Sequence, residues 1–174
     1  MNEKSKNNEK KNLNRSYKQF EILLKVCLVI GIIIISGFII YYIFTPEPGY
    51  VTLGILNGDK KAEDYPTSAT VNETISFYVN VGNYLNRDFS FRVEILKGDN
   101  KTIVLPSCSI NATSYYNTTK ITLLHKRFWI SKMLNISFSQ PGANQRIIAE
   151  LWEIPASGIE KCFNVVYLWL TILP

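Results

Sequence analysis

The pattern of hydrophobic and polar residues divides this chain into two regions with different periodicities. From Val26 to Phe44 no side chain is charged, and isoleucine, valine, leucine, phenylalanine and tyrosine dominate. A helix over this run is about 28 Å long, close to the thickness of the hydrocarbon core of a bilayer. Pro46 ends the helix. We therefore predict a transmembrane helix at residues 22–44 in contact with the lipid bilayer, and a linker at residues 45–49.

A cleavable signal peptide is the alternative interpretation of the same apolar run. A signal peptide has a shorter apolar region, about 7–15 residues, and small residues at its cleavage site. The run in this chain continues into Thr45-Pro46-Glu47-Pro48, which does not have the composition of a cleavage site. We therefore favour an uncleaved membrane anchor.

After the linker the apolar residues recur at every second position. Thr74–Val81 and Phe89–Leu96 both alternate strictly between apolar and polar side chains, which is typical of half-buried strands. Turn-forming residues such as Asn57-Gly58 and Pro141-Gly142 separate the apolar runs. Further strands are expected at Tyr50–Leu56, Thr102–Leu105, Lys120–Leu124, Leu134–Phe138, Arg146–Trp152 and Val165–Leu173.

Seven or eight short strands without a long helical stretch predict an all-β domain over residues 50–174. An immunoglobulin-like or fibronectin-like sandwich is the natural packing for strands of this length and spacing. Lys126–Met133 fits no strand pattern well, and a short helical turn is the alternative there. Trp129, Trp152 and Trp169 are expected to pack in the core; the alternative is that they form platforms for carbohydrate.

The charge distribution predicts how the chain crosses the membrane. The first 25 residues carry 7 basic and 3 acidic side chains, which accounts for +4 of the net charge of +5. Basic residues before an apolar span place the N-terminus in the cytoplasm. We expect residues 1–21 to form a disordered cytoplasmic tail and the β-domain to be extracellular. The basic balance is thus a signal of topology, and we expect no binding of nucleic acid.

Asn-x-Ser/Thr sequons are the clearest chemical feature of the predicted extracellular part, and they indicate N-glycosylation. An asparagine-rich composition that meets serine and threonine by chance is the alternative. Asn100 is expected in a turn and Asn111 and Asn117 in a loop, whereas Asn135 points outward between Leu134 and Ile136. The five candidate acceptors are Asn72, Asn100, Asn111, Asn117 and Asn135.

Cys108 and Cys162 are the two cysteines outside the predicted span, while Cys27 lies within it. Two thiols in an extracytoplasmic domain favour a disulfide. Two unpaired cysteines are the alternative, because sequence does not show whether their Cα atoms are close.

The sequence offers little material for catalysis or for binding a metal or cofactor. Asp59, Glu63 and Asp64 form an acidic cluster, but two lysines interrupt it, and we expect a solvated loop rather than a Ca²⁺ site. His125 is followed by two basic residues, and no nucleophile is indicated beside it. No nucleophile elbow, phosphate loop, zinc spacing or dinucleotide fingerprint is present. We therefore expect no enzyme, no metal and no cofactor.

Four motifs occur in the order of a known family. They are Leu53–Thr67, Val79–Asn83, Pro141–Gln145 and Tyr167–Trp169. In these motifs, residues 50–173 resemble the domain of an archaeal membrane-protein family named domain of unknown function 1616. The resemblance implies an archaeal source and a membrane-tethered β-domain outside the cell, and it implies no catalytic residues. Many members have several membrane spans before this domain, whereas this chain has one. By comparison with the motif, we expect Tyr65 to be buried and Pro66 to fix a turn in a segment between the first two strands, with a ligand-binding loop as the alternative.

These features favour a single-pass cell-surface protein whose glycosylated sandwich is a non-catalytic binding or structural module of the cell envelope, with an envelope protein or glycan as partner. The alternative is an accessory subunit of a membrane complex that associates through Gly31, Ser36 and Gly37 of the span. A third hypothesis, an envelope hydrolase, requires two convergent carboxylates or His125 in a pocket.

Overall fold

The structure is a computed structural model that describes residues 3–45, 48–106 and 108–174, with side chains from Arg15 onward. It separates into two compact units, Met1–Glu47 and Pro48–Pro174. The boundary between the units lies inside the linker predicted at residues 45–49.

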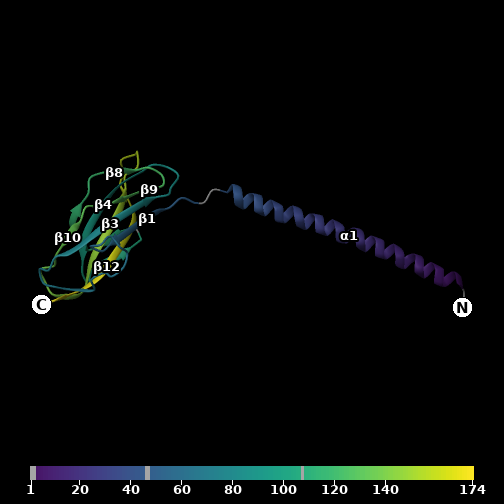
Figure 1. Ribbon diagram of the computed structural model, residues 1–174, viewed down its shortest axis with the longest axis horizontal. Coiled ribbons are helices and arrows are strands. Elements are labelled where there is room, and N and C mark those ends of the chain that lie inside the picture. Colours follow the sequence, from purple (N-terminus) through teal and green to yellow (C-terminus); the bar gives the residue numbers. More distant parts are fainter. Residues whose placement is uncertain (1–2, 46–47, 107) are drawn as a thin grey trace. The chain divides into compact units, whose positions relative to one another are not determined.

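The first unit consists of one helix, α1 (Glu3–Phe44) (Figure 1). The prediction of a disordered tail at residues 1–21 is therefore wrong for the residues from Glu3 onward. Extending an existing helix adds one hydrogen bond for each residue fixed, so a long apolar helix readily propagates toward its N-terminus. No glycine or proline precedes Gly31, and Lys25 forms an ion pair with Glu21 one turn earlier at 2.6 Å.

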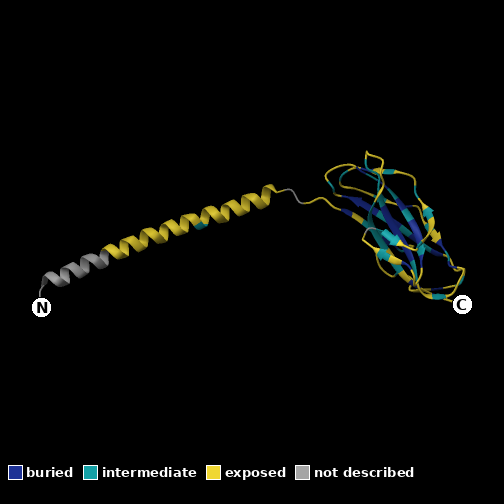
Figure 2. Ribbon diagram, turned by 180° about the vertical axis from the view of Figure 1, so that it is seen from behind, coloured by how far each residue is buried: buried dark blue, intermediate teal, exposed yellow. Residues whose placement is uncertain are grey.

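The apolar side chains of α1 are exposed along the described length of the helix (Figure 2). Residues Arg15–Phe44 are long and apolar enough to cross a membrane, by length and composition. A helix of this length and composition fits a membrane span, and a signal sequence near the N-terminus meets the same criteria.

The second unit is a β-sandwich, as predicted, and its smaller sheet is built around β3 (Ile75–Asn83). β1 (Val51–Leu56) pairs antiparallel with one edge of β3. β10 (Leu134–Ile136) and β9 (Arg127–Ile130) pair antiparallel with successive parts of its other edge. β1 therefore forms one edge of this sheet, and β10 and β9 together form the other.

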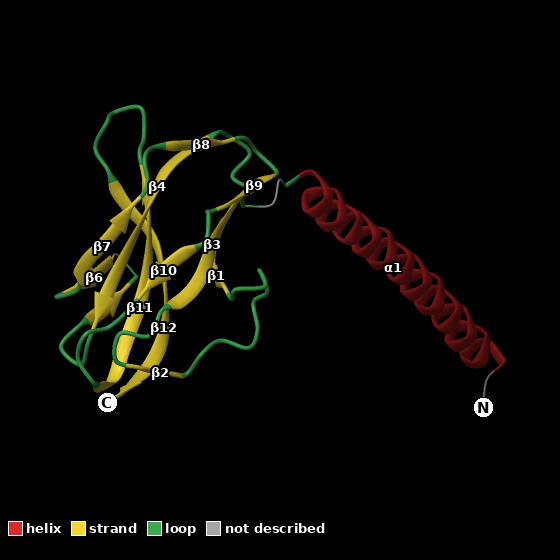
Figure 3. Ribbon diagram, turned by 60° about the vertical axis from the view of Figure 1, so that its left-hand side comes forward, coloured by secondary structure: helices red, strands yellow, loops and turns green. Residues whose placement is uncertain are grey.

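The larger sheet has the order β2-β12-β11-β4-β7, with β8 (Ile121–Leu123) also paired to β4. Its pairs are antiparallel, except that β2 runs parallel to the end of β12. The members are β2 (Ser68–Thr70), β4 (Phe89–Gly98), β7 (Thr113–Asn117), β11 (Gly142–Glu153) and β12 (Lys161–Leu173). Figure 3 shows the long connection between β1 and β2 as a green loop.

A separate hairpin consists of β5 (Ile103–Leu105) and β6 (Cys108–Ile110). Cys108 of this hairpin forms a disulfide with Cys162 at the start of β12, with a Cα–Cα distance of 5.9 Å. The disulfide holds the hairpin against the outer face of the larger sheet.

The core lies between the two sheets and follows the period-two pattern of the sequence. On β3 and β4 every second residue is buried while its neighbours are only partly buried. The pattern ends near the C-terminal end of each strand, where adjacent residues are both buried. The largest fully buried side chains include Phe77, Phe89, Phe91, Ile147 and Leu151. Burying such side chains stabilises a fold by about 1.5–3 kcal/mol each.

The described residues form twelve strands, more than the seven or eight predicted. β2, β6, β7 and β9 were missed because each is short and largely exposed, so none shows a clear apolar alternation. The helical turn considered at Lys126–Met133 is wrong, because Arg127–Ile130 forms β9 and pairs with β3.

Candidate interaction surface

The outer face of the larger sheet carries the polar residues that alternate with the core residues of β4 and β11. The register places Arg92 opposite Trp152 and Glu94 opposite Glu150. Side chains directly opposite each other on one face of a sheet lie within interaction distance. This face therefore brings together charged and aromatic side chains that are about 60 residues apart in the sequence.

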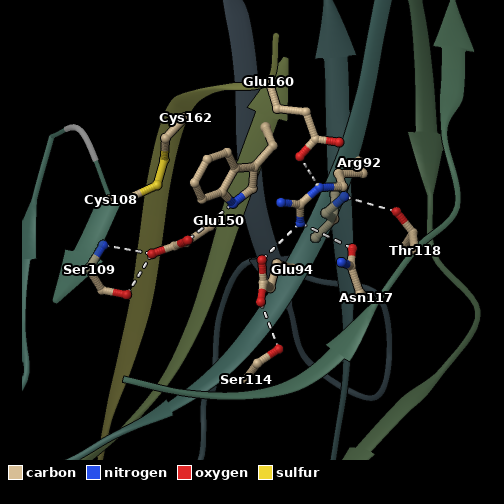
Figure 4. A network of polar contacts seen from close by, with 12 residues as sticks. Arg92, Glu94, Cys108, Ser109, Ser114, Asn117, Thr118, Glu150, Glu160 and Cys162 are labelled. Atoms are coloured by element: carbon tan, nitrogen blue, oxygen red, sulfur yellow. Dashed lines mark hydrogen bonds and ion pairs between the residues drawn. A yellow bond between two sulfur atoms is a disulfide. The ribbon is translucent and has the colours of Figure 1, made fainter. Parts of the chain in front are cut away.

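Arg92 is the centre of a polar network on this face (Figure 4). Its Nη1 donates to Glu94 Oε2 and its Nε donates to Glu160 Oε2, both at 2.8 Å. The guanidinium carbon lies 4.7 Å from the ring centroid of Trp152. Ser114 of β7 donates to the second oxygen of Glu94 at 2.7 Å, so the network ties β7 to β4 and to the loop before β12.

These contacts shift the pKa values of both members of the central ion pair. Desolvation by itself lowers the pKa of Arg92, but the bonds and charges of Glu94 and Glu160 outweigh it and raise that pKa. Desolvation by itself raises the pKa of Glu94, but the bonds from Ser114 and Arg92 and the charge of Arg92 outweigh it and lower that pKa. The pair is therefore charged across the physiological range.

Glu150 is a buried carboxylate that fixes the β5–β6 hairpin. Its Oε1 accepts hydrogen bonds from the backbone N–H and the hydroxyl of Ser109, and its Oε2 accepts one from Trp152 Nε1 at 3.1 Å. A buried carboxylate requires such donors, because burial without them costs several kcal/mol. The sulfur atoms of Cys108 and Cys162 lie close to Glu150, but they are joined to each other and so are not free thiolate ligands for a metal.

Glu94 and Glu150 are the convergent carboxylates that the hydrolase hypothesis required. All four of their oxygens accept hydrogen bonds from protein groups. A general acid or base needs an oxygen within reach of a substrate proton, and this arrangement instead directs both carboxylates to the hairpin and to neighbouring strands. The geometry favours a structural role for the pair.

A second cluster on the same face is exposed and lies farther along β11 and β12. Arg146 lies opposite Trp169 in the register, with its guanidinium carbon 3.8 Å from the centroid of the indole ring. Tyr167 packs edge-on against Trp169 at 5.7 Å. Trp169 and Tyr167 remain 47% and 41% exposed, so each ring offers apolar surface to solvent. We call Arg146, Tyr167 and Trp169 the aromatic patch.

A hydrogen bond to the backbone holds the Arg146 side chain in place. Its Nη1 donates to the carbonyl of Thr102 at 2.8 Å, and its Nε is buried without a hydrogen-bond partner. A guanidinium fixed at one end and stacked on an aromatic ring loses little conformational entropy when a ligand binds. The aromatic patch is thus a rigid surface made of residue types that dominate binding energy at interfaces.

The structure places all five sequon asparagines at exposed positions. Asn100 lies in a turn, as expected, and Asn135 points outward from β10 between Leu134 and the buried Ile136. Asn117 was expected in a loop, but it is the last residue of β7. Its Oδ1 accepts a hydrogen bond from Arg92 at 3.2 Å, which leaves the amide nitrogen, the atom that carries a glycan, available. Whether the five sites carry glycans stays a prediction.

Three of the five sequons lie along one side of the sandwich. β7 and β10 are the edge strands of the two sheets on that side, and the Tyr115 hydroxyl of β7 donates to the carbonyl of Asn135 on β10 at 2.9 Å. Asn117 and Asn135 lie on these two strands, and Asn111 lies two residues before β7. We call the edges of β7 and β10 the sequon-bearing side.

The remaining residues singled out from the sequence do not converge on a site. Asp59, Glu63 and Asp64 are exposed, and Glu63 pairs with Lys61 at 3.3 Å. His125 Nδ1 accepts a hydrogen bond from the backbone N–H of Asn86 at 3.1 Å. The acidic residues thus lie in an exposed loop, and one ring nitrogen of His125 is occupied by a backbone donor.

The predicted core positions of the tryptophans hold only in part. Trp129 is half-buried and packs edge-on against Phe91, whereas Trp169 lies on the outer face and is largely exposed. Tyr65, expected to be buried, is half-buried and donates its hydroxyl to the Ile55 carbonyl at 2.7 Å. Tyr167 and Trp169 alternate with the apolar Leu168 and Leu170, so the two aromatic residues point to the face opposite the core. This alternation is the sequence signal that could have revealed the aromatic patch.

Comparison with known proteins gives a likeness of fold. No family model and no curated protein matches the chain, so membership in the family named above stays a prediction. The CARDB domain of a Pyrococcus furiosus protein, in complex with di-metal ions, is 20% identical, with a TM-score of 0.47 over 75% of this chain and 93% of that chain.

Two further solved structures show the same kind of likeness. A β-glucosidase from Erythrobacter marinus matches 72% of this chain and 16% of its own, with 10% identity and a TM-score of 0.45. A sporulation control protein from Bacillus subtilis matches 72% of this chain and 50% of its own, with 7% identity and a TM-score of 0.45. The second unit is thus similar to CARDB-like β-sandwich domains.

Proposed function

We propose that this chain is a single-pass, membrane-anchored protein of the cell surface whose β-sandwich is a non-catalytic binding module of the cell envelope. The aromatic patch is the observation that carries the proposal. A tryptophan, a tyrosine and an arginine lie side by side on a rigid strand pair, and both rings are more than 40% exposed. Exposed clusters of these three residue types are typical of interface hot spots.

The location follows from the helix and the disulfide. A long apolar helix near the N-terminus and a disulfide in the following domain indicate an extracytoplasmic location for the sandwich. In the proposal the helix is an uncleaved anchor with its N-terminus in the cytoplasm, and an envelope protein or glycan is the partner. Membership in the family named domain of unknown function 1616, with its archaeal source, belongs to the same proposal and is supported by the four sequence motifs.

Mild crosslinking on intact cells tests this function with the full chain. We expect the native chain to recover a partner and Trp169→Ala to reduce that recovery by about 30-fold or more, since an aromatic hot spot buried by the partner contributes roughly 2 kcal/mol or more. Phe128→Ala is the matched control, because Phe128 is 72% exposed on β9 of the other sheet. Recovery of no partner from the native chain would contradict the proposal.

An accessory subunit of a membrane complex is the second candidate, and one feature of α1 favours it. Gly37 leaves a notch on the helix surface that Ile34, Phe38 and Tyr41 border. Small residues on a helix allow a second helix to approach closely in a bilayer. Replacing the span by an unrelated apolar helix should then abolish association, whereas unchanged association excludes this candidate.

A further inference from the structure

The outer edge of β12 has a stretch without strand partners between two fixed points. The disulfide holds Cys162 at the start of the strand, and β2 pairs with Thr171–Leu173 at its end. Hydrogen-bonding groups of an antiparallel strand alternate between its two edges. Thr171 donates its N–H to Thr67, on the side away from β11, so the backbone groups of Tyr167 and Trp169 point to that same side.

Within the described ranges, no strand pairs with Tyr167 or Trp169 on this edge, and no turn or loop donates to or accepts from their outward backbone groups. The next outward N–H, that of Val165, is satisfied by the side-chain oxygen of the adjacent Asn164 at 2.8 Å. This contact confirms that the N–H groups of Val165, Tyr167 and Trp169 point away from β11. The Asn164 side chain supplies the acceptor that a neighbouring strand would otherwise supply. The free edge therefore covers about one strand's length, from Phe163 to Leu170.

Natural monomers protect such edges with lysine, proline, a bulge or a covering loop. From Phe163 to Leu173 the strand has no charged residue and no proline. Its register with β11 is regular from Val165 to Leu170, since both register shifts lie outside that stretch. The edge thus keeps the straight, uncharged form that accepts an additional strand.

A groove lies beside this edge, between β12 and the edge of β1, and Tyr65 of the β1–β2 connection also lines it and bonds to the Ile55 carbonyl. The groove has a volume of about 350 Å³, and none of its lining residues is charged. Leu53 and Ile55 of β1 face Val166 and Leu168 of β12 across it. The backbone groups of Leu53 point into the groove by the same alternation, because those of Thr52 and Gly54 point to β3. Asn80 also lines it, and its buried Oδ1 has no hydrogen-bond partner.

The distribution of sequons separates this side from its opposite. None of the five sequon asparagines lies on β1 or β12, whereas the opposite edges, β7 and β10, carry or adjoin three of them. We call the edges of β1 and β12 the open side. If the sequons are occupied, glycans at three of them cover the sequon-bearing side. Asn72 lies beyond the C-terminal end of β12, two residues after β2, and residues 163–170 of β12 carry no sequon.

We infer that the open side binds an extended, uncharged segment of another envelope protein, which adds as a strand to β12 between Phe163 and Leu170. A row of unpaired main-chain groups requires main-chain donors and acceptors, and an added strand supplies them in register. Its alternate side chains would be apolar, because they enter the uncharged groove. The inference deepens the proposed function and rests on it.

A second copy of this chain fits the edge less well than a single foreign strand. β2 occupies the last three positions on the same edge of β12. When two copies of β12 pair in antiparallel orientation, the β2 strand of each copy approaches the start of the other β12, where the disulfide and the hairpin lie. A single added segment ends beside β2 without this conflict.

Residue-resolved hydrogen exchange on the full chain tests the inference. In lipid nanodiscs without other proteins, the amides of Tyr167 and Trp169 should exchange at least about 100-fold faster than those of Val166 and Leu168, which bond to β11. In membranes from the native cells, the amides of Tyr167 and Trp169 should slow by about tenfold or more. Tyr167→Lys should abolish this slowing by adding an edge charge, and Phe128→Lys on β9 should preserve it.

Three outcomes overturn the inference. The first is slow exchange of the Tyr167 and Trp169 amides in nanodiscs that hold a monomer. The second is slow exchange there because the chain dimerises. The third is exchange that remains fast in native membranes. If the amides remain fast while crosslinking to the native chain still recovers a partner that Trp169→Ala loses, strand addition is wrong and the binding module stands. Failure to recover any partner contradicts both.

Discussion

The strand edges on the two lateral sides of the sandwich differ in their contacts. On the sequon-bearing side, Tyr115 of β7 bonds the backbone of β10, and Lys97 of β4 donates to the carbonyl of Ser137 just after β10. On the open side, the edges of β1 and β12 face each other across an uncharged groove with no strand between them over residues 163–170.

This difference indicates which contacts of the domain stabilise its fold and which groups are available for binding. Contacts that tie the two sheets together stabilise the fold, and glycans on the sequons beside them would add bulk that discourages edge-to-edge association. Exposed aromatic rings and free backbone groups contribute little to stability and remain available to a partner. Substitutions on the two sides should therefore separate loss of stability from loss of binding.

The largest loss of stability is expected from removing the disulfide that fixes the start of β12. Replacing Cys108 and Cys162 by serine releases a loop of 54 residues, which costs about 4 kcal/mol in the chain-entropy model. Denaturant unfolding of the full chain, followed by tryptophan fluorescence, measures the change. A loss below about 1 kcal/mol would show that the bonds of Glu150 hold the hairpin by themselves.

On the sequon-bearing side, Lys97→Met should be the next most destabilising change. The substitution keeps the aliphatic stem but removes the charged bond to Ser137 and the cation–π contacts with Tyr115 and Phe138. Hydrogen bonds to charged groups contribute about 1.5–3 kcal/mol, so the free energy of unfolding should fall by about that amount. Lys101→Met is the matched control, because Lys101 is exposed in a turn.

The ion pair of Arg92 and Glu94 predicts a dependence on pH. The pKa of Glu94 is lowered in the folded state, where Ser114 and Arg92 outweigh desolvation, so the stabilisation is complete above the ordinary glutamate pKa of about 4.3. It is lost as the pH falls below that value and through the lowered pKa. Glu94→Gln should cost about 1–2 kcal/mol at neutral pH and flatten the decline in acid.

Stability curves from pH 7 to pH 2 check this prediction against the native chain. Parallel curves for the native chain and Glu94→Gln would contradict a lowered pKa for Glu94. Asp59→Asn is a suitable control, because Asp59 lies in an exposed loop.

The smallest effect on stability is expected on the open side, from Trp169→Ala. The ring is 47% exposed, and Arg146 keeps its bond to Thr102 when the indole is removed. The free energy of unfolding should change by less than about 1 kcal/mol, while recovery of the partner falls. A loss of several kcal/mol would place Trp169 in the core and would remove the separation between the two sides.

The strictly alternating segments made much of the fold predictable from sequence. Thr74–Val81 and Phe89–Leu96 became β3 and β4, because one face of each strand is buried and the other is not. Short edge strands such as β7 and β9 were not predictable, since their side chains are mostly exposed on both faces and only pairing with β4 and β3 fixes them.

The candidate surface was less predictable than the fold. The sequons and the cysteines are readable locally, but the aromatic patch depends on the register that places Arg146 beside Trp169, 23 residues later in the chain. Likewise, the free edge of β12 depends on β2 pairing with its last three residues alone. The alternation of Tyr167 and Trp169 with apolar residues is visible locally, but the register that brings Arg146 beside Trp169 leaves no local signal in the sequence.

Adding a glycan to the open side tests most directly the claim that this side binds the partner. Ser68→Asn completes a sequon with Ala69 and Thr70, at an exposed position of β2 opposite Thr171. With the added glycan verified by mass, crosslinking on intact cells should recover about tenfold less partner than from the native chain. Ser68→Gln, which has no sequon, should recover as much partner as the native chain. Equal recovery from the glycosylated Ser68→Asn chain and from Ser68→Gln would contradict the account.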